Sequence, residues 1–297
     1  MADICPIVNT ERLLLATESS EFSEGAIREA IRMAKRCSSK LTAISVIETN
    51  PEFESTAPQV LEKMEKEVRS HLNNVQERAK QEGVACEIAV HEGEDSYKYI
   101  VDEAVSQKCT MIIMGRRGKK GFRRLVMGST TSWTIGHAPC SVLVVPRNAQ
   151  VEFKSIVVAT DGSPHSAAAA SEAIGIAKRN NAKLTVIAVV PADIATPADI
   201  DFATIQREKL ADQEMQVAEK NARIVKEAAQ KAGVDAQAFV MSGKPADAIM
   251  EIAKDKAADL VVVGSHGRTG LDRLLMGSVA ERVIVLSSCA VLVAKGM

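Results

Sequence analysis

The chain alternates short, continuous apolar segments with longer amphipathic ones. In the first half the apolar segments are rich in Val, Ile and Leu. They lie at residues 12–16, 41–47, 84–90, 111–114 and 142–145. Runs of this kind are typical of strands in a parallel sheet that is covered by helices on both faces. We therefore expect five mainly parallel strands in this half of the chain.

The segments between the predicted strands have helical spacing. Apolar residues recur every three or four positions at Val60, Leu61, Met64, Val68, Leu72, Val75 and Ala79, and again at Leu210, Met215, Val217, Ala218, Ala222 and Val225. Such a stripe predicts a helix that packs one face on the sheet. Strands and helices in alternation, with right-handed crossovers, predict a doubly wound, Rossmann-like α/β fold.

The two halves of the chain are copies of one unit. Residues 16–20 (ATESS) match residues 159–163 (ATDGS), and residues 140–144 (CSVLV) match residues 289–293 (CAVLV). A repeat of this length has the size of a domain, whereas solenoid units are much shorter. We expect two tandem domains, residues 1–149 and 150–297, each with a five-stranded, mainly parallel sheet and helices on both faces.

Charge and composition narrow the class of protein. Among 297 residues, 37 Lys and Arg balance 38 Asp and Glu, so no overall field attracts nucleic acid or an anionic membrane. No apolar run reaches the roughly 18 residues of a membrane span, and the first residues do not resemble a signal peptide. Tyr97, Tyr99 and Trp133 are scattered, which argues against a stacking platform for single-stranded nucleic acid. We expect a cytoplasmic protein without membrane or nucleic-acid partners.

The cysteines give no sign of a metal site. They stand at Cys5, Cys37, Cys86, Cys109, Cys140 and Cys289, without a CxxC pair or a zinc spacing. In a reducing compartment such residues act as small buried apolar side chains. We expect all six to be reduced, and no metal ion to be held by protein groups alone.

A glycine-rich motif occurs once in each half. Its spacing is G-x-x-G, nine residues, then G-S, at Gly264, Gly267, Gly277 and Ser278 and at Gly115, Gly118, Gly128 and Ser129. Glycines let backbone amides approach a phosphate, and the start of a helix favours an anion. The motif is neither a GxxxxGK[ST] loop nor a GxGxxG fingerprint. A plain connecting loop is the alternative, but the repetition of the full spacing favours a phosphate cradle.

Asp161 follows the first predicted strand of the second half. In doubly wound sheets, ligands bind at the carboxyl ends of the strands, so this carboxylate could accept hydrogen bonds from a ligand. Asp161 or Ser163 could also cap the helix that begins near Pro164, and the two roles are compatible. His165 completes a Ser, His and Asp set, but a hydrolase triad also needs an oxyanion hole, and we expect none.

Through these residues the sequence resembles the universal stress protein family, and specifically its ATP-binding branch, over nearly the whole chain. The resemblance implies an adenine nucleotide, ATP, ADP or AMP, with Mg²⁺ as an optional companion of the phosphates. It assigns Asp161 to adenosine, the backbone of Val189 to adenine and the glycine loop to ribose and phosphates. The implied ligand residues of the second half are Thr160, Asp161, Val189, Gly264, Ser265, His266, Gly267, Arg268, Gly277, Ser278 and Val279. Those of the first half are Thr17, Glu18, Val46, Gly115, Arg116, Gly118, Lys119, Gly128, Ser129 and Thr130.

The resemblance also implies that the domains pair with each other. Residues 142–145 and 291–294 resemble the family's dimerisation strand, and in a tandem chain these two strands would pair. A further homodimer and unnamed protein partners stay open.

The first half departs from the pattern. It has Glu18 where the second has Asp161, so its nucleotide site is in doubt. Its loop is also more basic, with Arg116, Arg117, Lys119, Lys120, Arg123 and Arg124. This loop could take a more phosphorylated ligand or another anionic partner, or it could be a solvated basic loop.

The doubled loop without a recognisable catalytic base favours a stress-response regulatory protein that binds adenine nucleotide. We assign no catalytic residue. One alternative is a slow ATPase or self-phosphorylating enzyme with Ser278 or Ser129 as acceptor. Another is a dimerisation scaffold that binds no nucleotide. We favour one competent site in the second half and an altered one in the first.

Overall fold

The computed structural model describes residues 5–7, 10–116, 127–191, 202–267 and 276–296. Of the predicted ligand residues, Gly118, Lys119 and Arg268 lie outside these ranges. The first part of the chain contains β1 (Arg12–Ala16), a 3-10 turn η1 (Glu21–Ser23), α1 (Glu24–Cys37), β2 (Lys40–Glu48), α2 (Pro51–Thr56), α3 (Pro58–Gln81), β3 (Cys86–Gly93), α4 (Ser96–Ser106), β4 (Met111–Gly115), α5 (Ser129–His137) and β5 (Ser141–Val145). The second part contains β6 (Ser155–Ala159), α6 (Pro164–Asn180), β7 (Lys183–Pro191), α7 (Phe202–Lys231), β8 (Ala236–Gly243), α8 (Pro245–Asp255), β9 (Leu260–Gly264), α9 (Ser278–Leu286) and β10 (Ala290–Ala294).

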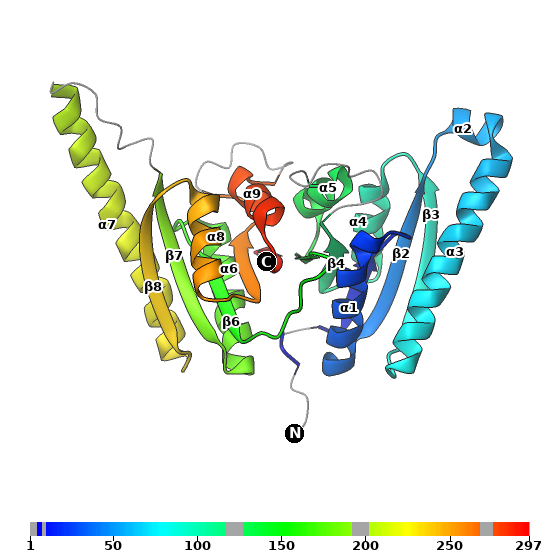
Figure 1. Cartoon of the computed structure of the whole chain (residues 1–297), viewed down its shortest axis with the longest axis horizontal. Helices are drawn as coiled ribbons and strands as arrows, with labels where there is room; N and C mark the ends of the chain where they lie inside the picture. Colours follow the sequence, from blue (N-terminus) through cyan, green and yellow to red (C-terminus); the bar gives the residue numbers. More distant parts are fainter. Residues whose placement is uncertain (1–4, 8–9, 117–126, 192–201, 268–275, 297) are drawn as a thin grey trace.

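All ten strands form one sheet in the order β3-β2-β1-β4-β5-β10-β9-β6-β7-β8. We call β1–β5 with their helices the first repeat and β6–β10 with theirs the second repeat. Within each repeat the strands are parallel, and the two repeats stand side by side in Figure 1. Both repeats use the same strand order, which reverses beside their first strand. The predicted doubly wound α/β fold is confirmed.

The repeats meet through their last strands. β5 and β10 run antiparallel, with Val144 opposite Val291, Leu143 opposite Leu292 and Val142 opposite Val293. These side chains are buried because helices cover both faces of the sheet. The predicted pairing of residues 142–145 with residues 291–294 is therefore confirmed.

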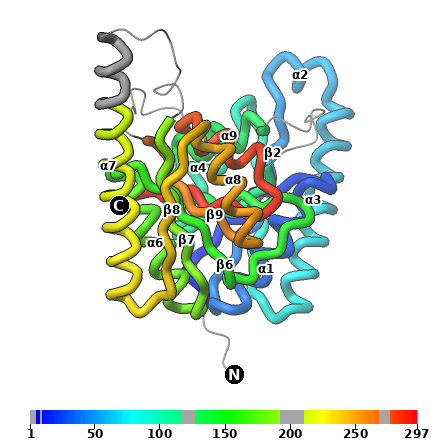
Figure 2. The backbone as a smooth tube through the Cα atoms, turned by 60° about the vertical axis from the view of Figure 1, so that its left-hand side comes forward, coloured from blue at the N-terminus to red at the C-terminus, as the bar shows by residue number. Residues whose placement is uncertain are grey.

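Two apolar cores, one on each face of the sheet, run through both repeats. Alternate residues of one strand serve different cores, as the period of a strand requires. Leu13 belongs to the core under α1, α3, α6 and α7, whereas Leu14 belongs to the core under α4, α5, α8 and α9. Figure 2, turned by 60° from Figure 1, shows α7 and α3 at opposite sides of the molecule. In the described part of the chain no helix is long and apolar enough to cross a membrane.

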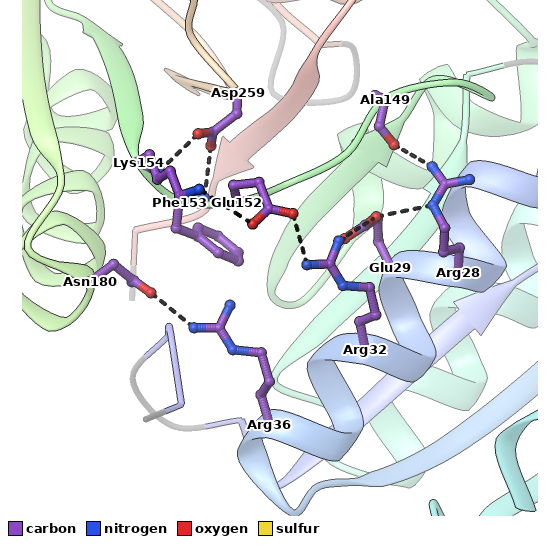
Figure 3. A network of polar contacts seen from close by, with 10 residues as sticks. All are labelled: Arg28, Glu29, Arg32, Arg36, Ala149, Glu152, Phe153, Lys154, Asn180 and Asp259. Atoms are coloured by element: carbon purple, nitrogen blue, oxygen red, sulfur yellow. Dashed lines mark hydrogen bonds and ion pairs between the residues drawn. The ribbon is translucent and has the colours of Figure 1, made fainter. Parts of the chain in front are cut away.

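The connection from β5 to β6 is clamped by both repeats. Arg28 of α1 donates to the carbonyl oxygen of Ala149, and Arg32 pairs with Glu152 at 3.0 Å. On the other side, the Asp259 carboxylate accepts the amides of Phe153 and Lys154 at 2.9 and 2.8 Å (Figure 3). These contacts fix the connecting segment against α1 and against the start of β9.

The expectation of six reduced cysteines is wrong for one pair. Cys5 forms a disulfide with Cys37 at the end of α1, so the N-terminal segment is tied to the first repeat. Sequence reasoning missed this pair because 32 residues separate the two cysteines and only folding brings them together. The remaining cysteines are free, and burial raises the pKa of the Cys86 and Cys109 thiols to about 11.

Reduction of this disulfide is expected to lower the free energy of unfolding by about 2–4 kcal/mol, because the bond restricts the unfolded chain. Urea unfolding with and without reductant measures the loss. Cys5→Ser should remove the sensitivity to reductant, and Cys86→Ser, which changes a free cysteine, should keep it. A count of six titratable thiols in the unreduced, unfolded protein, in place of the four free cysteines, would contradict the pairing.

Candidate nucleotide site

The predicted site residues of the second repeat gather where the strand order reverses. Thr160 and Asp161 follow β6, Ser265 follows β9, and β6 and β9 are neighbouring parallel strands. The next strand along the chain, β7, pairs with the other edge of β6. The Thr160 amide donates to the carbonyl oxygen of Ile187 of β7 at 2.9 Å. Doubly wound sheets bind ligands at this position.

The Asp161 carboxylate lies against the backbone of the glycine loop. A Cβ atom added at Gly267 would stand 2.9 Å from Asp161 Oδ2, so any side chain at 267 would press on the carboxylate. Asp161 Oδ1 accepts the Ser163 amide at 2.9 Å, which orients the carboxylate in the turn. The carboxylate and the loop, which are predicted as ligand groups from segments about a hundred residues apart, are thus in contact.

Helix α6 begins in the same turn. Ser163 is its N-cap, and the Ser163 side chain accepts the Ser166 amide at 3.2 Å. Between Asp161 and this cap, Gly162 has a φ of 80°, and a Cβ atom here would stand 2.5 Å from the Asn221 side chain of α7. Ser163 therefore caps α6, and Asp161 lies in the turn that precedes the cap.

Helix α9 begins beside the glycine loop, directly after Gly277. Its N-cap, Gly277, has extended backbone (φ −62°, ψ 140°) and, as a glycine, has no side chain that could accept the first amides of α9. The Gly277 amide donates to the Ser265 carbonyl at 2.9 Å, which closes the glycine loop. Ser278 and Val279 are exposed at this end. Such a helix start is suited to an anion.

Two histidines, His165 and the predicted ligand residue His266, lie beside Ser265 of the loop. Ser265 is almost fully buried, and its hydroxyl contacts His165 Nδ1 at 3.3 Å and His266 Nδ1 at 3.1 Å. The two rings are 5.0 Å apart. Burial, then the neighbouring His266, lower the pKa of His165. The hydroxyl that contacts His165 belongs to Ser265 of the loop, and not to Ser163 or Ser166 of its own turn.

The first repeat has the same turn with a different carboxylate. The Glu18 amide donates to Ser23 Oγ at 3.3 Å, as the Asp161 amide donates to Ser166 Oγ at 3.4 Å. The longer Glu18 side chain, however, accepts from the Ser20 hydroxyl at 2.7 Å, where Asp161 accepts a backbone amide.

The rest of the first site also differs. Thr17 Oγ1 contacts His71 Nε2 of α3 at 3.0 Å, and α3 is the counterpart of α7. Gly128 is the N-cap of α5, again without a capping side chain, and its amide donates to Arg116 at 3.1 Å. Ser129 and Thr130 form the first turn of α5.

The remaining predicted ligand residues lie on the strands. Val46 and Val189 occupy equivalent, half-buried positions near the carboxyl ends of β2 and β7. Gly115 ends β4 and Gly264 ends β9, and a Cβ atom at Gly264 would stand 2.7 Å from the His165 backbone carbon. Arg116 reaches out of its own repeat, since its Nη1 lies 2.8 Å from the Ser287 carbonyl oxygen at the end of α9. In the described residues no group of three or more His, Cys, Asp or Glu is placed to hold a metal ion.

Fold and site together define a tandem doubly wound α/β protein with a carboxylate and a glycine loop at the strand reversal of each repeat. The model of the universal stress protein family matches residues 9–146 and 152–295. The chain therefore belongs to the universal stress protein family, as the sequence motif implies.

Several relatives support this membership. Universal stress protein MJ0531 of Methanocaldococcus jannaschii is 43% identical over 151 residues, which are 50% of this chain and 86% of that protein. Universal stress protein Mb2019 of Mycobacterium bovis is 28% identical over 308 residues and covers 95% of this chain and 94% of its own. A crystal structure of a universal stress protein from Archaeoglobus fulgidus has the same fold, with a TM-score of 0.72, 22% identity, and coverage of 97% of this chain and 99% of that one.

Proposed function

We propose that the chain is a regulatory protein that binds an adenine nucleotide, ATP, ADP or AMP, in the second repeat, and that the first repeat is an altered site. The observation that carries this proposal is the contact of the Asp161 carboxylate with Gly267, beside a helix start without a capping side chain. The Asp161 carboxylate, which can accept hydrogen bonds from hydroxyl groups, and the start of α9, which can bind an anion, then belong to one site. We also propose residues 1–149 and 150–297 as the domain boundaries.

Each part of the site has a binding role in this proposal. The Asp161 carboxylate accepts hydrogen bonds from the ribose hydroxyls, and the amides at the start of α9 hold the phosphates. The backbone of Val189 meets the adenine, and a Mg²⁺ ion, where present, is held by the phosphates. A side chain at Gly267 would press on the Asp161 carboxylate, and one at Gly277 would press on the backbone of Ser265 and His266, so glycine at both positions keeps the shape of the site.

The first test is to identify the bound molecule. Freshly purified protein is denatured, and any released nucleotide is identified by chromatography and mass. ATP, ADP or AMP in the released fraction supports the proposal. If nothing is released and added ATP neither binds nor raises the melting temperature, the proposal is wrong, and the chain is better explained as a dimerisation scaffold that binds no nucleotide. Multiple-turnover release of phosphate would indicate the slow ATPase instead of a binding protein.

Asp161→Ala is expected to weaken ATP binding by about ten- to a hundredfold, because charged hydrogen bonds contribute about 1.5–3 kcal/mol. Isothermal titration calorimetry gives both the affinity and the number of sites. The matched control is Glu18→Ala, which makes the equivalent change in the first repeat and should leave the tighter binding event unchanged. Equal losses in the two variants, or two equal sites in the wild type, would contradict the asymmetry.

A further inference from the structure

Arg116 connects the first repeat to the phosphate-binding helix of the second. It follows β4 directly, at the position that Ser265 takes after β9. The half-buried Arg116 side chain crosses to the second repeat, where Nη1 lies 2.8 Å from the carbonyl oxygen of Ser287, 2.9 Å from that of Val285 and 3.3 Å from that of Ile284.

These carbonyls form the C-terminal end of α9. The last carbonyls of a helix have no partner within the helix and carry a partial negative charge, so a guanidinium group stabilises them. The opposite end of α9 begins at Ser278, in the proposed phosphate site. One helix of nine residues therefore joins a residue of the first repeat to the nucleotide site of the second.

The reverse contact also exists, in a weaker form. Lys295, which follows β10, donates from Nζ to the Gly136 carbonyl at 3.2 Å, near the C-terminal end of α5. Burial lowers the pKa of Lys295, so this cation costs more to keep charged. Each helix that starts at a G-S pair is thus held at its far end by the other repeat. Arg116 makes the stronger contact, because it approaches three carbonyls where Lys295 approaches one.

We propose that Arg116 is a positioning residue for the nucleotide site of the second repeat. It fixes the C-terminal end of α9 and thereby the amides at the opposite end that receive the phosphates. This inference rests on the proposed function. Because coupling between two contacts is reciprocal, a nucleotide at α9 should in turn strengthen the contact of Arg116 with the helix end.

Arg116 affects the affinity for nucleotide by fixing the position of α9, and not by attracting the phosphates directly. The length of α9, nine residues, is about 13.5 Å at a rise of 1.5 Å per residue. The Debye length at physiological ionic strength is only about 8 Å, so salt screens most of the direct attraction between Arg116 and a phosphate. The loss of affinity in an Arg116 variant should therefore persist at about 0.5 M salt, where a pure field effect would disappear.

The experiment measures ATP binding to the full chain by calorimetry. Arg116→Met, which keeps the aliphatic stem, is expected to weaken the tighter event by about five- to tenfold. Arg116→Lys keeps a cationic donor and should stay within about threefold of the wild type. The control is Arg282→Gln, which removes an exposed cation of α9 that pairs with Asp247 and should change the affinity by less than about twofold.

Hydrogen exchange on the protein without nucleotide is the second readout. Arg116→Met should speed exchange in α9 more than in α5, with the melting temperature within about 2 °C of the wild type. If this variant is unstable, Arg116→Ser introduces the residue that the second repeat has at this position. Wild-type affinity in Arg116→Met would overturn the inference alone, whereas a wild type that binds no ATP would overturn the proposed function and the inference with it.

Discussion

Gly277→Val is expected to remove nucleotide binding from the second repeat. A Cβ atom at Gly277 would stand 3.2 Å from the Ser265 carbonyl oxygen and 3.3 Å from His266 Cα. Both neighbours are backbone atoms, which cannot turn aside as a side chain could. The two γ-carbons of valine add further bulk where the α9 amides would meet the phosphates. We expect affinity to fall at least about a hundredfold, or about 2.8 kcal/mol.

Calorimetry and the mass of any released nucleotide check this result. Gly277→Ala should show an intermediate loss, since it adds only the Cβ atom. Gly128→Val changes the equivalent N-cap in the first repeat and should leave the tighter event intact. Retention of wild-type affinity by Gly277→Val would remove α9 from the site, while an unchanged melting temperature without ligand shows that the loss is local.

Gly25→Ala is expected to destabilise the whole chain, although alanine normally favours a helix over glycine by about 1 kcal/mol. Gly25 lies in the first turn of α1, and its Cβ atom would stand 2.3 Å from the Pro146 carbonyl oxygen and 3.0 Å from the Arg147 carbonyl oxygen. The segment after β5 is clamped by Arg28 and cannot move away freely. Such overpacking costs about 1–3 kcal/mol, which reverses the ordinary effect of the substitution.

The second repeat offers the matched control. In the second repeat Ala168 of α6 takes the place of Gly25, and Gly296 takes the place of Arg147. A Cβ atom at Gly296 would stand 3.5 Å from the Ala168 Cβ, which is an ordinary van der Waals distance. Gly296→Ala should change the free energy of unfolding by less than about 0.5 kcal/mol. Urea unfolding distinguishes the two. If the Gly25→Ala protein is as stable as the wild type, the segment after β5 can move away from α1 at little cost, and the prediction is wrong.

The fold could be predicted because local patterns encode it. Residues 12–16 form β1 as predicted, since continuous apolar character is what burial on both faces demands. The prediction is less accurate for the third strand. The sequence predicts residues 84–90, whereas β3 spans Cys86–Gly93. Val84 instead closes the end of α3, where its amide donates to Ala79. β3 is an edge strand with half-buried side chains, so its apolar signal is weak at both ends.

The site could be predicted only in part. Glycine spacing and Asp161 are visible along the chain, because a loop and a turn are local features. The contact of Ser265 with His165 joins residues 100 positions apart, and that of Arg116 with Ser287 joins residues 171 positions apart. No periodicity or short motif encodes such contacts, since they depend on how the strands are ordered and on how the repeats pair. The assignment of individual ligand residues stays a prediction until binding is measured.

The pairing of β5 with β10 has a consequence for how the two sites can differ. In a homodimer of one repeat, every residue beside a site is duplicated by symmetry, and a change that suits one site is imposed on the other. Here one covalent chain contains both partners, so their association does not depend on protein concentration. The fused chain can therefore keep Ser265 beside one site and place an arginine at the same position beside the other. Two identical subunits cannot differ in this way, because each residue of one subunit is repeated in the other.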